Sequence, residues 1–234
     1  MNEKVWEKSC NISPSLITLD MCNLEQQTKI LEENGIEMLH VDILDGHFSP
    51  SMPLGLDTVK QLRKKTNLEF EAHVMVKDPQ FFIDELIEAG ASQIVFHVET
   101  CDHIDGMLNY IHSKGIRAGV ALKPATPLSV LEYVLDKCDA VLLMLINPGF
   151  AQMKGEAQTS YSARKIHEFH EMIKARGLDT KVILDGRISP ENISTYGTSG
   201  EANIFVAGST CIKKDDMEGS LKRLVELENQ INQK

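Results

Sequence analysis

Short aliphatic runs alternate with amphipathic stretches along this 234-residue chain. The runs are rich in Val, Ile and Leu, as buried strands are, and the stretches between them repeat apolar residues at helical spacing. Strands that alternate with helices pair in parallel, because each helix carries the chain back to the start of the next strand. The alternation therefore predicts a parallel sheet that is covered by helices.

Eight of the runs are predicted to be strands. They are Cys10–Ile17, Met38–Leu44, Leu68–Met75, Gln93–Val98, Arg117–Leu122, Ala140–Ile146, Lys181–Asp185 and Ile204–Ala207. The predicted helices include Leu24–Asn34, Pro79–Ala89, Ile104–Ser113, Leu128–Leu135, Tyr161–Arg176 and Asp216–Gln233. Glycines fall where left-handed caps would end four of these helices. They are Gly35, Gly90, Gly115 and Gly177.

Eight such units fit a (β/α)8 TIM barrel, whose usual size is about 250 residues. A doubly wound open sheet shows the same alternation. Polar residues at the carboxyl ends of the strands favour the barrel, because those ends converge on one site only when the sheet closes. These residues are Ser15, Asp42, His73, Glu99, Asn147, Asp185 and Ser209. Since no linker or low-complexity segment divides the chain, residues 1–234 are expected to form a single barrel domain.

The composition narrows the choice of partners. A net charge of −10 argues against nucleic acid or an anionic membrane as a partner. The five cysteines are scattered and form no C-x-x-C pair, as expected in a reducing cytoplasm. No run approaches the ~18 apolar residues of a membrane span, and the N-terminus lacks the apolar core of a secretory signal. We therefore expect a cytoplasmic protein.

Two histidines and two aspartates close strand-like runs, where they are poor core material because burying them unpaired is expensive. His40 and Asp42 alternate along one run, so both point to the same side of the strand. His73 and Asp185 end two other runs. This mixed nitrogen and oxygen set suits one divalent metal ion, such as Zn, Fe, Mn or Co. A buried hydrogen-bonded His–Asp network fits the same pattern equally well.

Six short motifs occur in order between Ile12 and about Cys211. They are Ile12–Leu16 (ISPSL), His40–Phe48 (HVDILDGHF), Ala72–Val76 (AHVMV), Phe96–Glu99 (FHVE), Asn147–Phe150 (NPGF) and Val206–Ser209 (VAGS). In order and spacing they resemble the ribulose-phosphate 3-epimerase family. The resemblance implies a phosphate-binding barrel with a metal-assisted epimerase site that uses two acid/base groups.

The resemblance also implies roles for individual residues. His40, Asp42, His73 and Asp185 match the family's metal ligands, and the two aspartates also match its paired acid/base residues. Epimerisation next to a carbonyl needs two such groups, because one proton leaves one face of the carbon and another returns to the opposite face. A metal ion neutralises the oxyanion that develops meanwhile.

Further positions match the family's substrate-binding residues. Ser15 matches a serine that contacts substrate. Met75 and Met144 match methionines that line the site, with Leu44 where a third is expected, although ordinary inward-facing barrel residues would fit too. The phosphate-binding backbone matches Gly149, Gly186, Gly208 and Ser209. His97 and Glu99 share a strand face and receive no assigned role.

Two departures from the family concern the phosphate. Ala151-Gln152-Met153 replaces a glycine pair, and Arg187 stands where a second glycine is expected after Gly186. The Arg187 guanidinium could bind phosphate bidentately, narrow the pocket or remain solvated. The reaction is therefore predicted more firmly than the substrate.

The leading hypothesis is metal-dependent epimerisation at C3 of a ketose phosphate, either D-ribulose 5-phosphate or a close analogue such as allulose 6-phosphate. A non-catalytic sugar-phosphate-binding paralogue is the alternative. Decarboxylation or aldol cleavage ranks last, because no strand end carries a lysine in the pattern D-x-K-x-x-D. Barrels of this kind commonly associate, so a homo-oligomer is expected.

Overall fold

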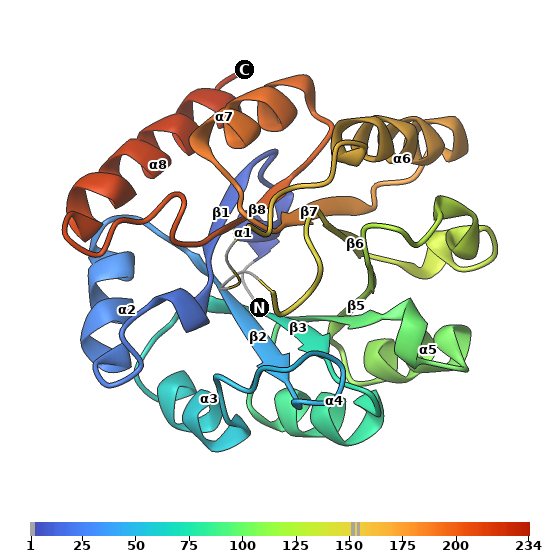
Figure 1. Cartoon of the computed structure of the whole chain (residues 1–234), viewed down its shortest axis with the longest axis horizontal. Coiled ribbons are helices and arrows are strands. Elements are labelled where there is room, and N and C mark those ends of the chain that lie inside the picture. The colour runs from blue at the N-terminus through green and yellow to red at the C-terminus, as the bar shows by residue number, and fades with distance from the viewer. Residues whose placement is uncertain (1–2, 151–152, 154) are drawn as a thin grey trace.

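The computed structural model describes residues 3–150, 153 and 155–234, and within them eight parallel strands form a barrel ringed by helices (Figure 1). The strands are β1 (Asn11–Pro14), β2 (Met38–Leu44), β3 (Glu69–Met75), β4 (Gln93–His97), β5 (Arg117–Leu122), β6 (Ala140–Met144), β7 (Lys181–Asp185) and β8 (Ile204–Ala207). They are hydrogen-bonded in the order β1-β8-β7-β6-β5-β4-β3-β2. A parallel bridge between Ser15 and His40 joins the two ends. The predicted barrel is confirmed, and the open sheet is excluded.

Helices follow most of the strands and cover the outside of the barrel. They are α2 (Leu24–Glu33), α3 (Leu56–Arg63), α4 (Pro79–Glu88), α5 (Ile104–Ser113), α6 (Ser162–Arg176), α7 (Pro190–Asn192) and α8 (Met217–Asn232), whereas α1 (Glu3–Glu7) precedes β1. The four predicted cap glycines all adopt positive φ, between 62° and 86°. The left-handed caps predicted from the sequence are therefore confirmed.

The predicted helix Leu128–Leu135 is wrong. The structure has two short 3₁₀ turns there, Leu128–Leu131 and Leu135–Lys137. Leu131 and Leu135 are both fully buried, so the turns bury the same apolar side chains that suggested a helix. The predicted strand Cys10–Ile17 also ends early, at Pro14, because Thr18 donates its N–H to the carbonyl of Ser15 and starts a 3₁₀ turn.

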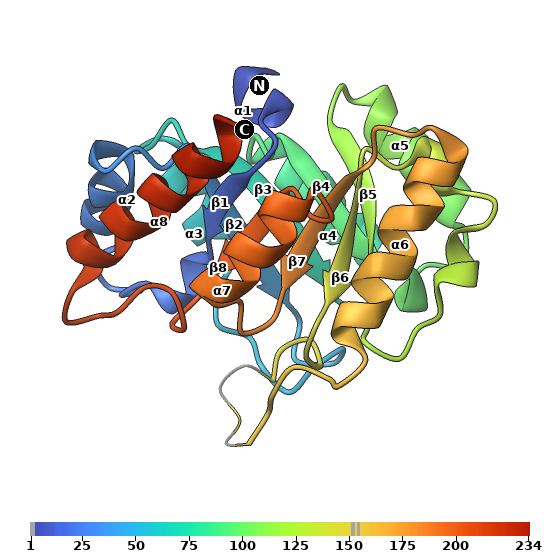
Figure 2. The same cartoon turned by 90° about the horizontal axis from the view of Figure 1, so that it is seen from above.

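Two hydrophobic layers hold the barrel together. The larger lies between the strands and the outer helices. The smaller fills the inside of the barrel with residues such as Val95, Leu142 and Ile183, and is joined by Val5 and Trp6 of α1. Figure 2 shows α1 at the end of the barrel opposite the loops that follow β2 and β6. The interior is therefore packed, and the carboxyl ends of the strands are the place where polar side chains gather.

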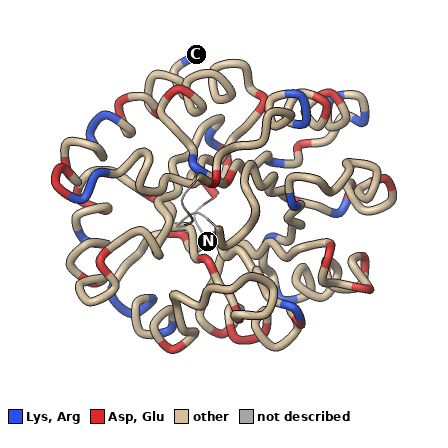
Figure 3. The backbone as a smooth tube through the Cα atoms, in the orientation of Figure 1, with Lys and Arg blue, Asp and Glu red and all other residues tan. Residues whose placement is uncertain are grey.

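Charged residues of both signs are interspersed around the helical ring, and acidic residues also lie near the barrel centre (Figure 3). Carboxylates in such a position need partners, because an unpaired buried charge is expensive. In the part of the chain that the structure describes, no helix combines the length and the hydrophobicity needed to cross a membrane.

Candidate active site

A cavity of about 120 Å³ opens at the carboxyl ends of the strands. The predicted acid/base and substrate-binding residues all line it. They are Ser15, Asp42, Met75, Met144, Gly149, Asp185, Gly186, Arg187, Gly208 and Ser209. His40 and His73 lie beneath it and are fully buried. Residues that are far apart in the sequence thus meet at one place.

The four predicted metal ligands face one another. One donor atom from each of His40, Asp42, His73 and Asp185 lies within 4.8 Å of the other three. His40 Nε2 is 3.1 Å from Asp42 Oδ1 and 3.9 Å from Asp185 Oδ2. His73 Nδ1 is 3.5 Å from each of the same two oxygens. Since β7 is separated from β2 by β8 and β1, closure of the barrel is what brings the two carboxylates together.

His73 Nδ1 shows that this cluster is not a self-contained network. The atom is buried and makes no hydrogen bond within the described chain. The carboxylate oxygens of Asp42 and Asp185 lie 3.5 Å away, too far for a good hydrogen bond, and a buried polar nitrogen without one costs free energy. A divalent ion between the four side chains would accept its lone pair together with two carboxylate oxygens and a second imidazole nitrogen. The residues present therefore fit a divalent ion better than they fit a closed His–Asp network.

Glu71 is a residue of this cluster that the sequence analysis did not single out. It is fully buried on β3, next to His40 in the strand register, and its Oε2 is 2.5 Å from His40 Nδ1. A proton on Nδ1 shared with Glu71 leaves His40 Nε2 facing the cluster. The available signal was an acidic residue two positions before His73, on the same face of the strand.

The electrostatics of the cluster follow from burial and close pairing. Burial disfavours a charged His40, but the carboxylates of Glu71 and Asp42 outweigh it and raise the pKa of His40 well above its usual value. Burial would likewise raise the pKa of Asp42, but the neighbouring His40 holds it well below its usual range. Ser15 Oγ donates to Asp42 Oδ2 at 2.7 Å. Asp42 is therefore an ionised carboxylate with one oxygen held by Ser15.

Apolar side chains cover the cavity beside the carboxylates. Met75 and Met144 are buried, and each sits in register with another cavity residue, Met75 with Leu44 and Met144 with Asp185. Thioether and methyl groups exclude water without offering strong hydrogen bonds. Proton transfer by the carboxylates would thus take place in a poorly hydrated environment.

Two glycines at the rim are required by their surroundings. Gly149 has φ +79°, and a Cβ there would lie 2.0 Å from Ser49 Oγ. Gly186 has φ +113°, and its Cβ would lie 2.8 Å from the Ile146 side chain. The backbone can therefore pass close to the cavity only without side chains at these positions.

Arg187 adopts the left-handed conformation that its matching glycine would take, with φ +52°. Its side chain is exposed, and Nη2 donates to the carbonyl of Met153 at 3.3 Å. Ala151 and Gln152, the other departure from the family pattern, lie outside the described residues. Across the cavity, the backbone N–H groups of Gly208 and Ser209 donate to no group in the described chain. These amides remain available to an anion.

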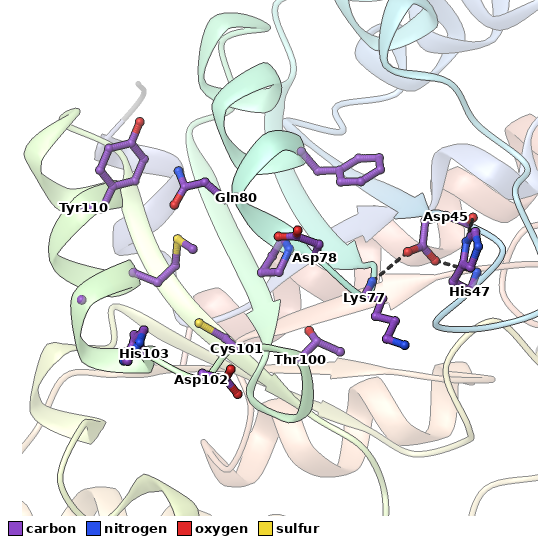
Figure 4. Close-up of a pocket in the computed structure, with 14 residues that line it drawn as sticks. Asp45, His47, Lys77, Asp78, Gln80, Thr100, Cys101, Asp102, His103 and Tyr110 are labelled. Carbon is purple, nitrogen blue, oxygen red and sulfur yellow. Dashed lines mark hydrogen bonds between the residues drawn. The ribbon is translucent and has the colours of Figure 1, made fainter.

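A second cavity, of about 810 Å³, lies outside the barrel near the starts of α4 and α5 (Figure 4). Asp78 and His103 are among the residues that line it. The Asp45 carboxylate at its edge accepts backbone hydrogen bonds from His47 and Lys77, both at 2.8 Å. None of the predicted site residues lines this larger cavity, and the His–Asp cluster lies at the smaller one. The chemistry is therefore assigned to the smaller cavity.

Comparison with known proteins agrees with this geometry. Residues 11–212 match the model of the ribulose-phosphate 3 epimerase family. The chain belongs to this family. Ribulose-phosphate 3-epimerases from Methanocaldococcus jannaschii and Escherichia coli K12 are 36% and 35% identical to it. The first match covers 92% of this chain and 89% of the relative, and the second covers 88% of this chain and 90% of the relative. The predicted family is confirmed, and the chain is an isomerase that acts on carbohydrates.

Two further matches agree. A ribulose-phosphate 3-epimerase from Bacillus subtilis is 33% identical over 91% of this chain and 97% of the relative. The solved structure of a phosphoribosylanthranilate isomerase from Thermotoga maritima superposes with a TM-score of 0.60 at 13% identity, covering 94% of this chain and 98% of the other. At that identity the likeness shows a shared fold alone.

Proposed function

We propose that this chain interconverts D-ribulose 5-phosphate and D-xylulose 5-phosphate by epimerisation at C3. Asp42 and Asp185 act as its acid/base pair, and one divalent ion is held by these two residues with His40 and His73. The observation that carries the proposal is the convergence of two carboxylates from β2 and β7 on one cavity. Family membership supports a pentulose phosphate as substrate. Nothing in the structure or the relatives favours allulose 6-phosphate.

The chain's own residues account for the proton transfers. The C3 proton is acidic because C3 adjoins the C2 carbonyl, and one carboxylate removes it from one face. The other carboxylate, on a strand across the cavity, returns a proton to the opposite face and inverts C3. A bound divalent ion would neutralise the negative charge that develops on the substrate. Met75 and Met144 would keep water from the reacting carbon.

The donor set of the cluster accommodates several metals. Two imidazole nitrogens and two carboxylates are compatible with Zn, Fe, Mn or Co. The ion is expected to be catalytic rather than structural, because the cluster contains no thiolate and lies at a cavity. The single-domain organisation, homo-oligomeric assembly and cytoplasmic location remain predictions from the sequence.

Proton exchange at C3 tests the proposed function directly. Protein purified with its divalent ion is incubated in deuterated water with D-ribulose 5-phosphate, D-xylulose 5-phosphate or D-allulose 6-phosphate. We expect deuterium at C3 of both pentulose phosphates, measured by NMR. Absence of exchange with both pentulose phosphates would overturn the proposal, whatever the hexulose phosphate does. Tight sugar-phosphate binding without exchange would instead favour a non-catalytic binding protein.

Arg187→Gly tests whether the guanidinium binds the phosphate. Glycine keeps the left-handed backbone without strain, so the change removes only the side chain and its contacts, such as the hydrogen bond to the Met153 carbonyl. We expect KM for the pentulose phosphate to rise about 10–150-fold with little change in kcat, because a hydrogen bond to a charged group contributes about 1.5–3 kcal/mol. The rise should shrink as salt is added. An unchanged KM would identify Arg187 as a solvated loop residue, and faster turnover of the hexulose phosphate would show that its bulk narrows the pocket.

A further inference from the structure

His97 and Glu99 continue the metal-ligand cluster outward from His73. His97 is fully buried at the end of β4, and its Nε2 lies 3.0 Å from His73 Nε2. On the other side of the same ring, Nδ1 lies 2.9 Å from Glu99 Oε2. A continuous line of hydrogen bonds therefore joins a carboxylate at the edge of the barrel to a proposed metal ligand at its centre.

Glu99 is held firmly at the outer end of this line. Its Oε1 accepts the backbone N–H of Lys123 at 2.8 Å and the hydroxyl of Thr126. The segment 123–126, which supplies these donors, is itself held in place by Lys165. Lys165 Nζ donates to the carbonyls of Lys123, Pro124 and Thr126 at 2.8–3.0 Å. Burial opposes ionisation of Glu99, but hydrogen bonds from His97 and Thr126 lower its pKa to about 2. Glu99 is thus an ionised acceptor held by donors from His97, Lys123 and Thr126.

The direction of each hydrogen bond follows from that acceptor. A carboxylate cannot donate, so His97 Nδ1 carries the proton that it shares with Glu99. Two ring nitrogens 3.0 Å apart share one proton. A neutral His97 accepts it at Nε2, and His73 Nε2 donates. The Nδ1 of His73 then keeps its lone pair, and this is the buried atom that faces Asp42 and Asp185 without a hydrogen bond.

We propose that Glu99 is a positioning residue for the metal site. Acting through His97, it holds His73 in the tautomer whose Nδ1 lone pair points at the two aspartates. The inference rests on the proposed metal site. Glu71 holds His40 by a direct contact in the same way, so each histidine ligand has its own carboxylate. Partners of this kind orient ligands, and removing one costs about 10–100-fold in metal affinity.

Glu99→Gln tests the proposal without changing the size of the side chain. The amide oxygen of Gln would accept the hydrogen bonds from Lys123 and Thr126, as Glu99 Oε1 does. The amide NH2 group would then face His97 Nδ1. His97 would then carry its proton on Nε2. This proton would face the one on His73 Nε2, so the two nitrogens could no longer share a hydrogen bond in the present tautomers. We expect the zinc affinity of the purified protein, measured by competition with a chelator, to fall about 10–100-fold. Thr126→Val, which removes one hydrogen bond but keeps the carboxylate, should stay within about threefold of wild type.

Nitrogen NMR on the zinc-loaded wild-type protein provides a second test that does not depend on the variant folding. We expect His97 to be neutral, with its proton on Nδ1 and a bare Nε2. A proton on His97 Nε2 would overturn the proposal, as would a zinc affinity of Glu99→Gln within twofold of wild type. Failure of the wild-type protein to bind any divalent ion would overturn the metal site itself, so the two failures can be told apart.

Discussion

Asp185→Asn is expected to lower kcat for C3 proton exchange by at least about 10³-fold. The amide can neither accept the C3 proton nor return one, and acid–base catalysis by a positioned side chain contributes about 10²–10⁴-fold. Loss of a carboxylate from the metal cluster adds to the effect. Exchange is measured by NMR in deuterated water, and folding is followed by circular dichroism and thermal unfolding.

Two matched Asp→Asn variants test whether the loss is specific to the two cluster aspartates. Asp42→Asn should cause a loss of the same order, since Asp42 also belongs to the cluster and is the acceptor of the Ser15 hydroxyl. Asp57→Asn, an exposed change of the same chemistry on α3, should leave exchange unaffected. In the proposed mechanism the two carboxylates serve opposite faces of C3, so residual exchange in the two variants should favour opposite epimers. Near wild-type exchange in Asp185→Asn would contradict its role as an acid/base group.

Removing the divalent ion with a chelator is expected to abolish measurable exchange, and adding the ion back should restore it. The ion also stabilises the folded chain, because the unfolded chain presents no assembled site. At an ion concentration of about 100 times Kd the gain is about 2.7 kcal/mol, which corresponds to a rise in Tm of about 5–10 °C for a protein of this size. Full exchange in protein shown by elemental analysis to be metal-free would contradict the proposed site.

The affinity for the ion should weaken as the pH falls. The raised pKa of His40 means that its imidazole stays protonated in the metal-free protein near neutral pH. Ion binding must displace that proton, so protons compete with the metal. We expect Kd to increase as the pH is lowered, with proton uptake on metal release detectable by calorimetry in buffers of different ionisation enthalpy. A pH-independent Kd would show that His40 does not carry this proton.

Several elements could be predicted because their signals are local. The bounds of β2, β5, β7 and β8 match the predicted strands, since an aliphatic run that ends in polar residues or glycine defines a buried strand by itself. The same reasoning gave a wrong helix prediction for the segment around Leu131 and Leu135. Apolar residues four positions apart can be buried by 3₁₀ turns as well as by an α-helix, and tertiary packing decides between them.

Some site residues could likewise be predicted from their own strand, whereas the roles of others depend on neighbouring strands. His40, Asp42, His73 and Asp185 could be singled out because each closes, or nearly closes, an aliphatic run. For Glu71 the sequence shows only an acidic residue two positions before His73, which gives no sign of the imidazole that faces it from the neighbouring strand. The importance of Glu99 depends in turn on donors from the segment after β5, which the local pattern around Glu99 does not show.

The sequence by itself determined the alternation of strands and helices, and with it the set of polar side chains that stand at the carboxyl ends of the barrel strands. Those properties follow from hydrophobic periodicity within each element. The closed barrel decided which of these side chains meet, because Asp42 and Asp185 come from strands far apart in the chain and face one cavity only when β1 pairs with β2. It also decided which nitrogen of each histidine points inward. That orientation depends on hydrogen bonds from neighbouring strands, and such contacts exist only in the folded protein.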